Sequence, residues 1–311
     1  MPWSLLSLYA LLAVGLLAAL WREVRDSLLV YAWGWTCLAA VAVGGVELWV
    51  VLGMTTSGAA EAAPSWLGPT RYAAACLLFC PLMSVLGSKR PHEQAWQWIV
   101  LSLWGILVLP AVEFLLVRRG ATLEIHGVRS WFLLGLIFLT ATHGIGTRGF
   151  PAGGLLALAQ TLLLRHHLPG LARWLEAEHH QPLSDSAITH VAVLLLIATL
   201  SWLLTLPRWH RHAPPQDRVW LDFRDAFGTL WALRIRERFN DAASAGSWDL
   251  RLAWLGFRRR IGTTTESPAT DPCAILDERA AQAFWNLARR FVTPAWCLRR
   301  GWTPPAGSVI E

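Results

Sequence analysis

The chain has 311 residues, of which 54% are hydrophobic and only 15% are charged, and its formal net charge is +6. Soluble domains carry about 25% charged residues, so this composition excludes an ordinary soluble domain and indicates a membrane protein. The charge is uneven, because residues 1–207 hold 11 Lys/Arg and 10 Asp/Glu whereas residues 208–311 hold 16 and 11. The basic residues after position 207 are interleaved with acidic ones, which favours membrane lipid over nucleic acid as a partner.

Seven apolar segments fill residues 1–207 and predict an all-α polytopic membrane bundle with about seven transmembrane helices. A bilayer core needs about 20 residues of helix, and the first four segments and the last one are adequate. The fifth and sixth segments are short. The predicted spans are residues 3–21, 27–52, 72–88, 95–117, 131–147, 150–165 and 187–206.

Arginines near the ends of the segments predict the orientation. Seven spans with the arginine-rich tail inside give a multi-pass protein of the cell membrane with a cytoplasmic C-terminus and an outer N-terminus. Six spans with both ends inside are the alternative. Residues 166–186 are predicted to form a short amphipathic helix at the membrane surface.

A glycine-rich stretch joins the two short segments. It is predicted either as a tight hairpin at one membrane face or as the centre of a re-entrant pair, which survives only inside protein or beside a wet cavity. Its GxGxxG spacing matches the dinucleotide-binding fingerprint, but an apolar segment precedes it where that fingerprint needs a strand. A broken helix or close backbone approach explains it better. The residues concerned are Gly144, Gly146, Gly149, Pro151 and Gly153.

Glu47 and Glu113 lie inside apolar segments, where a carboxylate normally faces the bundle interior and has a partner. In the seven-span arrangement both fall in the outer third of the membrane. They are predicted either to form ion pairs that fix helix packing or to form a proton, cation or substrate site. The polar residues expected at similar depth are Arg71, Arg118, Arg119 and His190.

His143 and His190 are the histidines within the predicted spans. Two histidines on facing helices can ligate haem, but His143 is expected near the inner face and His190 near the outer face. They are therefore too far apart to share one iron. The histidines and glutamates of residues 166–186 are interpreted as a solvated polar face, because zinc sites need tighter ligand spacing.

Residues 208–311 predict a small α+β domain of helix, strand and helix. Trp220, Phe223, Phe227 and further apolar residues recur at helical spacing, and Asp217 is the expected N-cap. Alternating apolar residues at 248–254 predict one strand, and residues 276–291 predict a second helix. Because one strand cannot satisfy its own edges, this tail is expected to lean on the membrane domain, on lipid or on another subunit.

No catalytic signature occurs in the sequence. The leading hypothesis is a non-enzymatic membrane subunit or scaffold whose tail, residues 208–311, binds a protein partner or the lipid surface. The alternative is a transporter or proton-coupled protein that uses Glu47, Glu113 and the glycine-rich break. A third hypothesis is a haem or redox subunit that uses His143 or His190.

Overall fold

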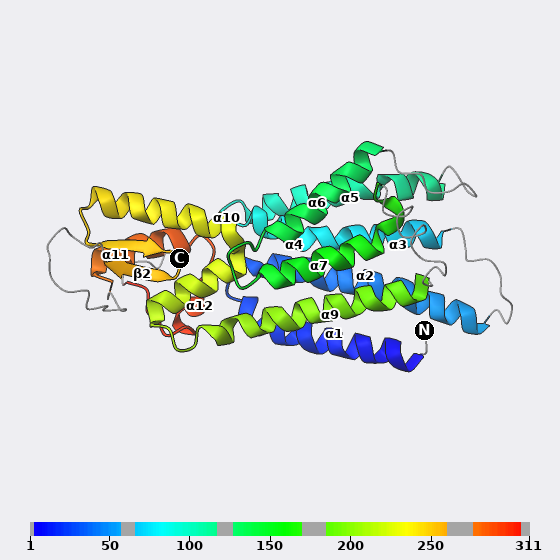
Figure 1. The fold of residues 1–311 in the computed structure, drawn as a ribbon, viewed down its shortest axis with the longest axis horizontal. Helices are drawn as coiled ribbons and strands as arrows, with labels where there is room; N and C mark the ends of the chain where they lie inside the picture. Colours follow the sequence, from blue (N-terminus) through cyan, green and yellow to red (C-terminus); the bar gives the residue numbers. More distant parts are fainter. Residues whose placement is uncertain (1–2, 57–65, 117–126, 170–184, 260–275, 306–311) are drawn as a thin grey trace.

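The computed structural model describes residues 3–56, 66–116, 127–169, 185–259 and 276–305. It shows an elongated helical bundle with a smaller domain at one end (Figure 1). The bundle elements are α1 (Trp3–Val24), α2 (Leu29–Thr56), α3 (Leu67–Cys76), η1 (Leu77–Phe79), α4 (Cys80–Leu86), α5 (Glu93–Leu116), α6 (Gly127–Thr142), α7 (Phe150–Leu163), η2 (Arg165–His167) and α9 (Asp185–Trp209). The C-terminal domain contains α10 (Pro215–Ala245), β1 (Leu250–Ala253), β2 (Gly256–Arg259), α11 (Glu278–Ala288) and α12 (Pro294–Leu298).

Five helical segments among the described residues have the length and composition of membrane spans. They are Ser4–Val24, Leu29–Leu52, Leu67–Leu86, Glu93–Leu116 and Ser186–Trp209. Helices α6 and α7 have only 16 and 14 residues, which is about 24 and 21 Å of helix against a bilayer core of about 30 Å. The helical bundle therefore fits a membrane protein with five candidate spans among the described residues, and the seven predicted spans are not confirmed.

The third span, Leu67–Leu86, lies at the centre of the bundle and is mostly buried. It is divided into α3, η1 and α4, and the division falls just before Pro81, which has no backbone N–H to continue the hydrogen-bond ladder. Side chains of neighbouring helices anchor the divided segment. Tyr72 donates to the Leu107 carbonyl of α5 at 2.9 Å, and Gln160 of α7 donates to the Leu78 carbonyl at 3.0 Å.

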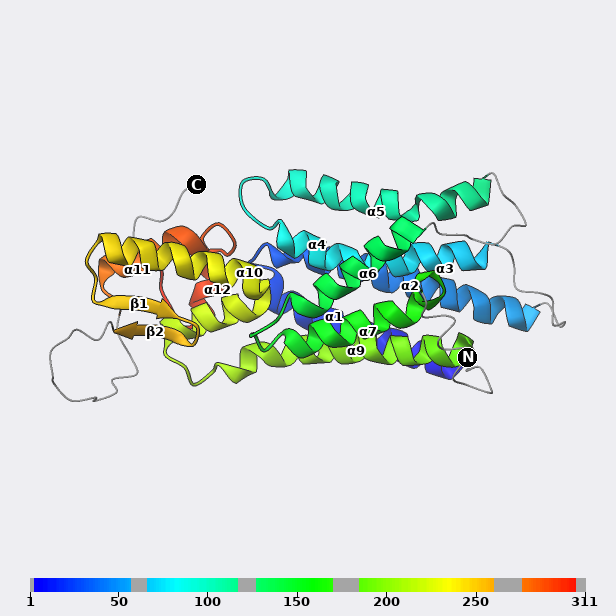
Figure 2. The same cartoon turned by 45° about the horizontal axis from the view of Figure 1, so that its top comes forward.

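The bundle helices alternate in direction, so that several chain junctions lie at the end beside the C-terminal domain (Figures 1 and 2). We call this the domain end of the bundle and the opposite end the far end. Helix α1 begins at the far end. The junctions at the domain end are residues 25–28, 87–92, 143–149 and 210–214.

Aromatic side chains form the core of the C-terminal domain. The predicted helical periodicity is confirmed for most positions, because Trp220, Phe223 and Phe227 are at most 1% exposed. Phe223 stacks on Phe227 with ring centroids 4.7 Å apart. Edge-to-face contacts join these rings to Phe291, after α11. The segment that follows α11 therefore completes the core that α10 begins.

The sequence-based description of this domain was wrong in two details. The single predicted strand is an antiparallel hairpin, in which β2 pairs with β1 and satisfies one of its edges. Asp217 is not the N-cap of α10, since Pro214 holds that position. Instead Asp217 is buried, and its Oδ1 accepts a hydrogen bond from the Phe257 N–H of β2 at 2.7 Å. It therefore ties the hairpin to the helix.

The C-terminal domain rests on the membrane bundle through main-chain contacts. Leu28 N–H donates to the Phe291 carbonyl at 2.9 Å, and Thr293 N–H donates to the Asp26 carbonyl at 3.0 Å. The indole of Trp231 donates to the Val85 carbonyl at 3.0 Å. From the sequence, the tail was expected to lean on the membrane domain, on lipid or on another subunit. These contacts show that it leans on the membrane domain.

Candidate functional site

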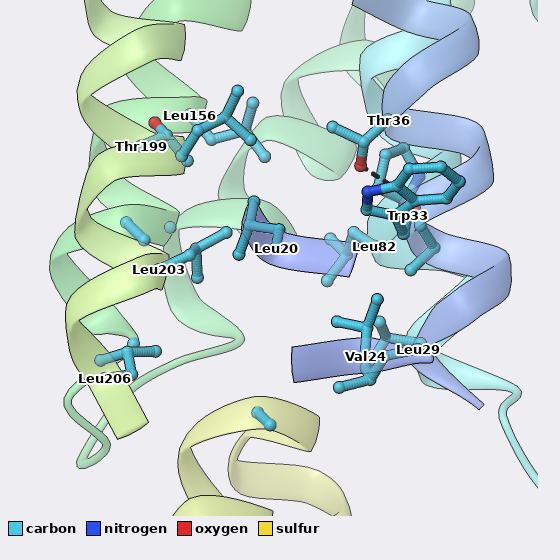
Figure 3. Close-up of a pocket in the computed structure, with 18 of the residues that line it drawn as sticks. Leu20, Val24, Leu29, Trp33, Thr36, Leu82, Leu156, Thr199, Leu203 and Leu206 are labelled. Atoms are coloured by element: carbon cyan, nitrogen blue, oxygen red, sulfur yellow. Dashed lines mark hydrogen bonds between the residues drawn. The ribbon is translucent and has the colours of Figure 1, made fainter. Parts of the chain in front are cut away.

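A cavity of about 310 Å³ lies between the helical bundle and the C-terminal domain. Figure 3 shows leucines of α9 on one side of it, Trp33 and Thr36 of α2 on the other, and Leu20 of α1 between them. Residues of α4, α6 and α7 also line it, and α10 closes the end nearest the C-terminal domain. Its size falls at the lower end of the range of small-molecule binding sites, about 300–1,000 Å³.

The walls of the cavity are apolar, although threonines occur among them. The Thr36 hydroxyl donates to the Ala32 carbonyl at 2.8 Å, and the Thr199 hydroxyl donates in the same way to Leu195 at 2.8 Å. These hydrogen bonds lie within single helices, so the hydroxyl protons are already engaged. The walls therefore favour a hydrocarbon or another apolar group.

The closing end of the cavity carries a buried charge network centred on Asp225. His210 Nε2 lies 2.8 Å from Asp225 Oδ2, and Arg224 Nε donates to Oδ1 at 2.9 Å. Burial by itself raises the pKa of the Asp225 carboxyl, but the hydrogen bond from His210 and the charge of Arg224 hold that pKa below its ordinary value. Asp225 therefore stays ionised and acts as a fixed acceptor.

A second buried carboxylate, Asp222, lies one helical turn before Asp225. Arg300 Nε donates to its Oδ2 at 2.7 Å, and the Arg300 guanidinium also lies 3.7 Å from Glu23. Burial raises the pKa of the Asp222 carboxyl, although Arg300 acts in the opposite direction. Asp222 Oδ1 is buried without a hydrogen-bond partner among the described residues. It offers hydrogen-bonding capacity at the boundary of the cavity.

The glycine-rich stretch forms the turn between α6 and α7 at the domain end, and it contacts α10 and the hairpin. The Gly146 carbonyl accepts from the Trp254 indole at 2.7 Å, and Arg148 N–H donates to Asp225 at 3.3 Å. Gly146 has a positive φ of 77°. A helix precedes this stretch and another follows it, so the strand that a dinucleotide site requires is missing here.

Close approach of neighbouring chain segments explains three glycines at this site. A Cβ at Gly149 would lie 3.1 Å from the Asp225 carbonyl, and one at Gly153 would lie 2.8 Å from the Thr140 carbonyl of α6. At Gly228, within α10, a Cβ would lie 2.3 Å from the His143 ring. The turn, α6 and α10 therefore fit together only where side chains are absent. Pro151 lies in the first turn of α7.

The two predicted intramembrane carboxylates are not brought together. Glu47 is 8% exposed and makes a two-pronged ion pair with Arg71, at 2.9 and 3.0 Å. Glu113 lies on α5 at an exposed position. Arg118 and Arg119 lie outside the described residues. Glu47 therefore joins α2 to α3 through its ion pair with Arg71.

His143 and His190 lie at opposite ends of the bundle. His143 lines the cavity at the domain end, where its carbonyl accepts from Thr229 N–H at 3.2 Å. His190 lies near the start of α9, beside the ring of Tyr9. Trp202 of α9 reaches the turn at Arg148, so His190 is twelve residues, or about 18 Å, from that level. The two histidines cannot share one iron.

Sequence reasoning missed the charged residues that close the cavity. Asp222 and Asp225 are three residues apart and so share one face of α10, and both occur between aromatic residues that are buried. Acids placed within an apolar face are the signal that could have revealed them. Within the described residues, no three His, Cys, Asp or Glu side chains lie together in a group that could hold a metal ion.

Comparison with known proteins gives no match, so the geometry of the site is the basis for its functional interpretation. No protein-family model matches the chain, and neither a curated protein nor a solved structure matches it.

Proposed function

We propose that this chain is a non-enzymatic membrane protein that holds a lipid-like molecule between its helical bundle and its C-terminal domain. The observation that carries the proposal is the cavity of about 310 Å³, because its walls are apolar and its closing end is polar. An amphiphile presents the same two surfaces. Its hydrocarbon part fits the leucine-lined walls, and its polar part lies toward Asp222 and His143.

The position of the C-terminal domain supports this proposal. The domain was expected to engage a protein partner or the lipid surface. Its contacts with the bundle also make it a cover for the cavity, since α10 contributes Asp222, Asp225, Ala226 and Gly228 to the lining. In this view the domain binds an amphiphile jointly with the membrane helices, in the cytoplasm beside the inner leaflet.

The transporter and redox hypotheses have less support from the geometry. Transport through Glu47 and Glu113 requires a shared pathway, but Glu47 is engaged by Arg71 and Glu113 is exposed on another helix. A haem held by His143 or by His190 requires a second axial ligand from elsewhere, because the two rings lie at opposite ends of the bundle.

The proposal can be tested by filling the cavity. Leu203 of α9 points into it (Figure 3), whereas Leu194 of the same helix is 50% exposed on the outer surface. The full chain is purified in mild detergent, supplied with an equal mixture of phosphatidylglycerol and phosphatidylcholine, and examined by native mass spectrometry. We expect one tightly retained lipid in the wild type and in Leu194→Trp, and its loss in Leu203→Trp. Equal retention by both variants would contradict the proposal.

A further inference from the structure

A second cavity, of about 530 Å³, lies at the domain end of the bundle beside the first one. The two cavities share the lining residues Glu23, Pro207, Asp222 and Arg300, so they adjoin. The walls of the second cavity differ completely in chemistry. Seven arginines line it against two carboxylates; they are Arg22, Arg25, Arg208, Arg211, Arg218, Arg299 and Arg300. We call it the arginine cavity.

Most of this positive charge is not compensated by the protein. Arg25 and Arg299 pair with Asp26, and Arg300 pairs with Asp222 and Glu23. Among the residues that the structure describes, the other four arginines, Arg22, Arg208, Arg211 and Arg218, have no acidic partner within 4.0 Å. The Nε of Arg218 is also buried and makes no hydrogen bond within the described chain. A buried donor of this kind requires an acceptor.

The arginine cavity lies at the level where membrane spans end. Arg22 is in the last turn of α1 and Arg208 is in the last turn of α9. Trp21 and Trp209, next to them in sequence, are 39% and 54% exposed. Indole rings favour the headgroup region of a bilayer. The guanidinium groups of the cavity are therefore placed at the depth of lipid phosphates.

We infer that the arginine cavity binds the phosphate of an anionic phospholipid whose hydrocarbon chains belong to the bilayer or to the adjoining apolar cavity. Guanidinium groups form paired, charge-assisted hydrogen bonds with phosphate oxygens, and the anionic lipids of an inner leaflet supply that group. The inference rests on the proposed function in taking the bound molecule to be an amphiphile. It adds the headgroup chemistry, which the apolar cavity alone does not specify.

The test compares headgroups and arginine variants in the full chain in mild detergent. Dioctanoyl phosphatidylglycerol and dioctanoyl phosphatidylcholine are titrated separately, and binding is followed by native mass spectrometry. We expect phosphatidylglycerol to bind at least about tenfold more tightly, and Arg208→Gln/Arg211→Gln to remove most of that preference. Both arginines are exposed, so the variant should fold. Thermal unfolding confirms this, and Arg211→Gln alone provides a second, milder variant.

The matched control removes the same charge at two positions on the C-terminal domain, away from the arginine cavity. Arg238 and Arg279 are exposed on α10 and α11 and do not line the arginine cavity. Arg238→Gln/Arg279→Gln should keep the preference for phosphatidylglycerol. Equal affinity for the two lipids, or equal losses in both double variants, overturns the inference. If inorganic phosphate displaces the lipid at the same concentration, the bound phosphate group is not supplied by a lipid.

These outcomes are separate from those that test the proposed function. If Leu203→Trp keeps its lipid, the apolar cavity is not the site and the proposed function fails. If Leu203→Trp loses its lipid but the wild type holds both headgroups equally, the proposed function stands and the inference of an anionic headgroup fails.

Discussion

Replacing Gly228 with alanine tests how the C-terminal domain closes the cavity. Gly228 divides α10 and has φ 79° and ψ 178°, a backbone region that is almost restricted to glycine and costs other residues about 1–3 kcal/mol. The new Cβ would also lie 2.3 Å from Nε2 and 2.5 Å from Cε1 of His143. Overpacking of this kind costs about 1–3 kcal/mol more. Gly228→Ala should therefore lower the free energy of unfolding by about 2–6 kcal/mol.

Thermal unfolding in mild detergent, followed by circular dichroism, measures this loss. At about 2 °C per kcal/mol for a chain of this size, we expect the unfolding temperature to fall by about 4–12 °C. Gly154→Ala is the control, because a Cβ there meets nothing within 4 Å. In the interior of α7 it should raise stability by about 0.5–1 kcal/mol.

A double-mutant cycle separates the two parts of the cost. In a His143→Ala background the ring is absent, so Gly228→Ala should cost only the backbone contribution of about 1–3 kcal/mol. If Gly228→Ala costs the same in both backgrounds, the close contact with His143 does not exist. If it behaves like Gly154→Ala, position 228 does not need the backbone conformation that divides α10.

Three further predictions use the same unfolding assay. Gly153→Ala should lower stability by about 1–3 kcal/mol, because its Cβ meets a carbonyl of α6 at 2.8 Å. The neighbouring Gly154→Ala should not lower stability. Equal effects of the two variants would contradict the packing of α6 on α7. Glu47→Gln should lower the free energy of unfolding by about 1–3 kcal/mol by leaving Arg71 unpaired. Adding Arg71→Gln to that variant should then cost little more. Fully additive losses would show that the two residues are not coupled. The pKa of Asp225 is lowered in the folded protein, so the carboxylate contributes stability that is present above the unfolded value of about 3.9 and is lost as the pH falls below it. The difference in unfolding temperature between the wild type and Asp225→Asn should therefore begin to narrow below about pH 4, and a constant difference from pH 7 to pH 3 would refute this assignment.

The sequence predicted the membrane bundle because apolar composition and segment length report directly on burial in lipid. Helix ends were accurate to within a few residues where the apolar segment was long, as in α5, which was expected at 95–117 and occurs at Glu93–Leu116. The short segments were less accurate. Residues 143–147 were assigned to a span, but they belong to the turn that follows α6, where their carbonyls accept hydrogen bonds from Thr229 and Trp254 of the C-terminal domain.

The candidate site could not be predicted from local pattern. Its walls come from six bundle helices and its closing end comes from α10, so it exists only after distant segments have packed. Asp222 and Asp225 stand out in the sequence as acids within an apolar helix face, but their partners Arg300 and His210 are identified only once the fold is known. The second strand was missed for a similar reason. The Phe257 N–H of this strand donates to Asp217, which lies forty residues earlier in the chain.

The contact between Asp26 and Thr293 joins residues that are 267 positions apart in the chain. At a synthesis rate of about 5–20 residues per second, the α1–α2 junction waits roughly 15–50 s before its partner segment has been made. The membrane helices can insert during this interval, but the cavity is not closed until the final part of the chain has left the ribosome. Under the proposed function, a lipid enters the open bundle before the C-terminal domain docks, and the order of synthesis provides the route for loading.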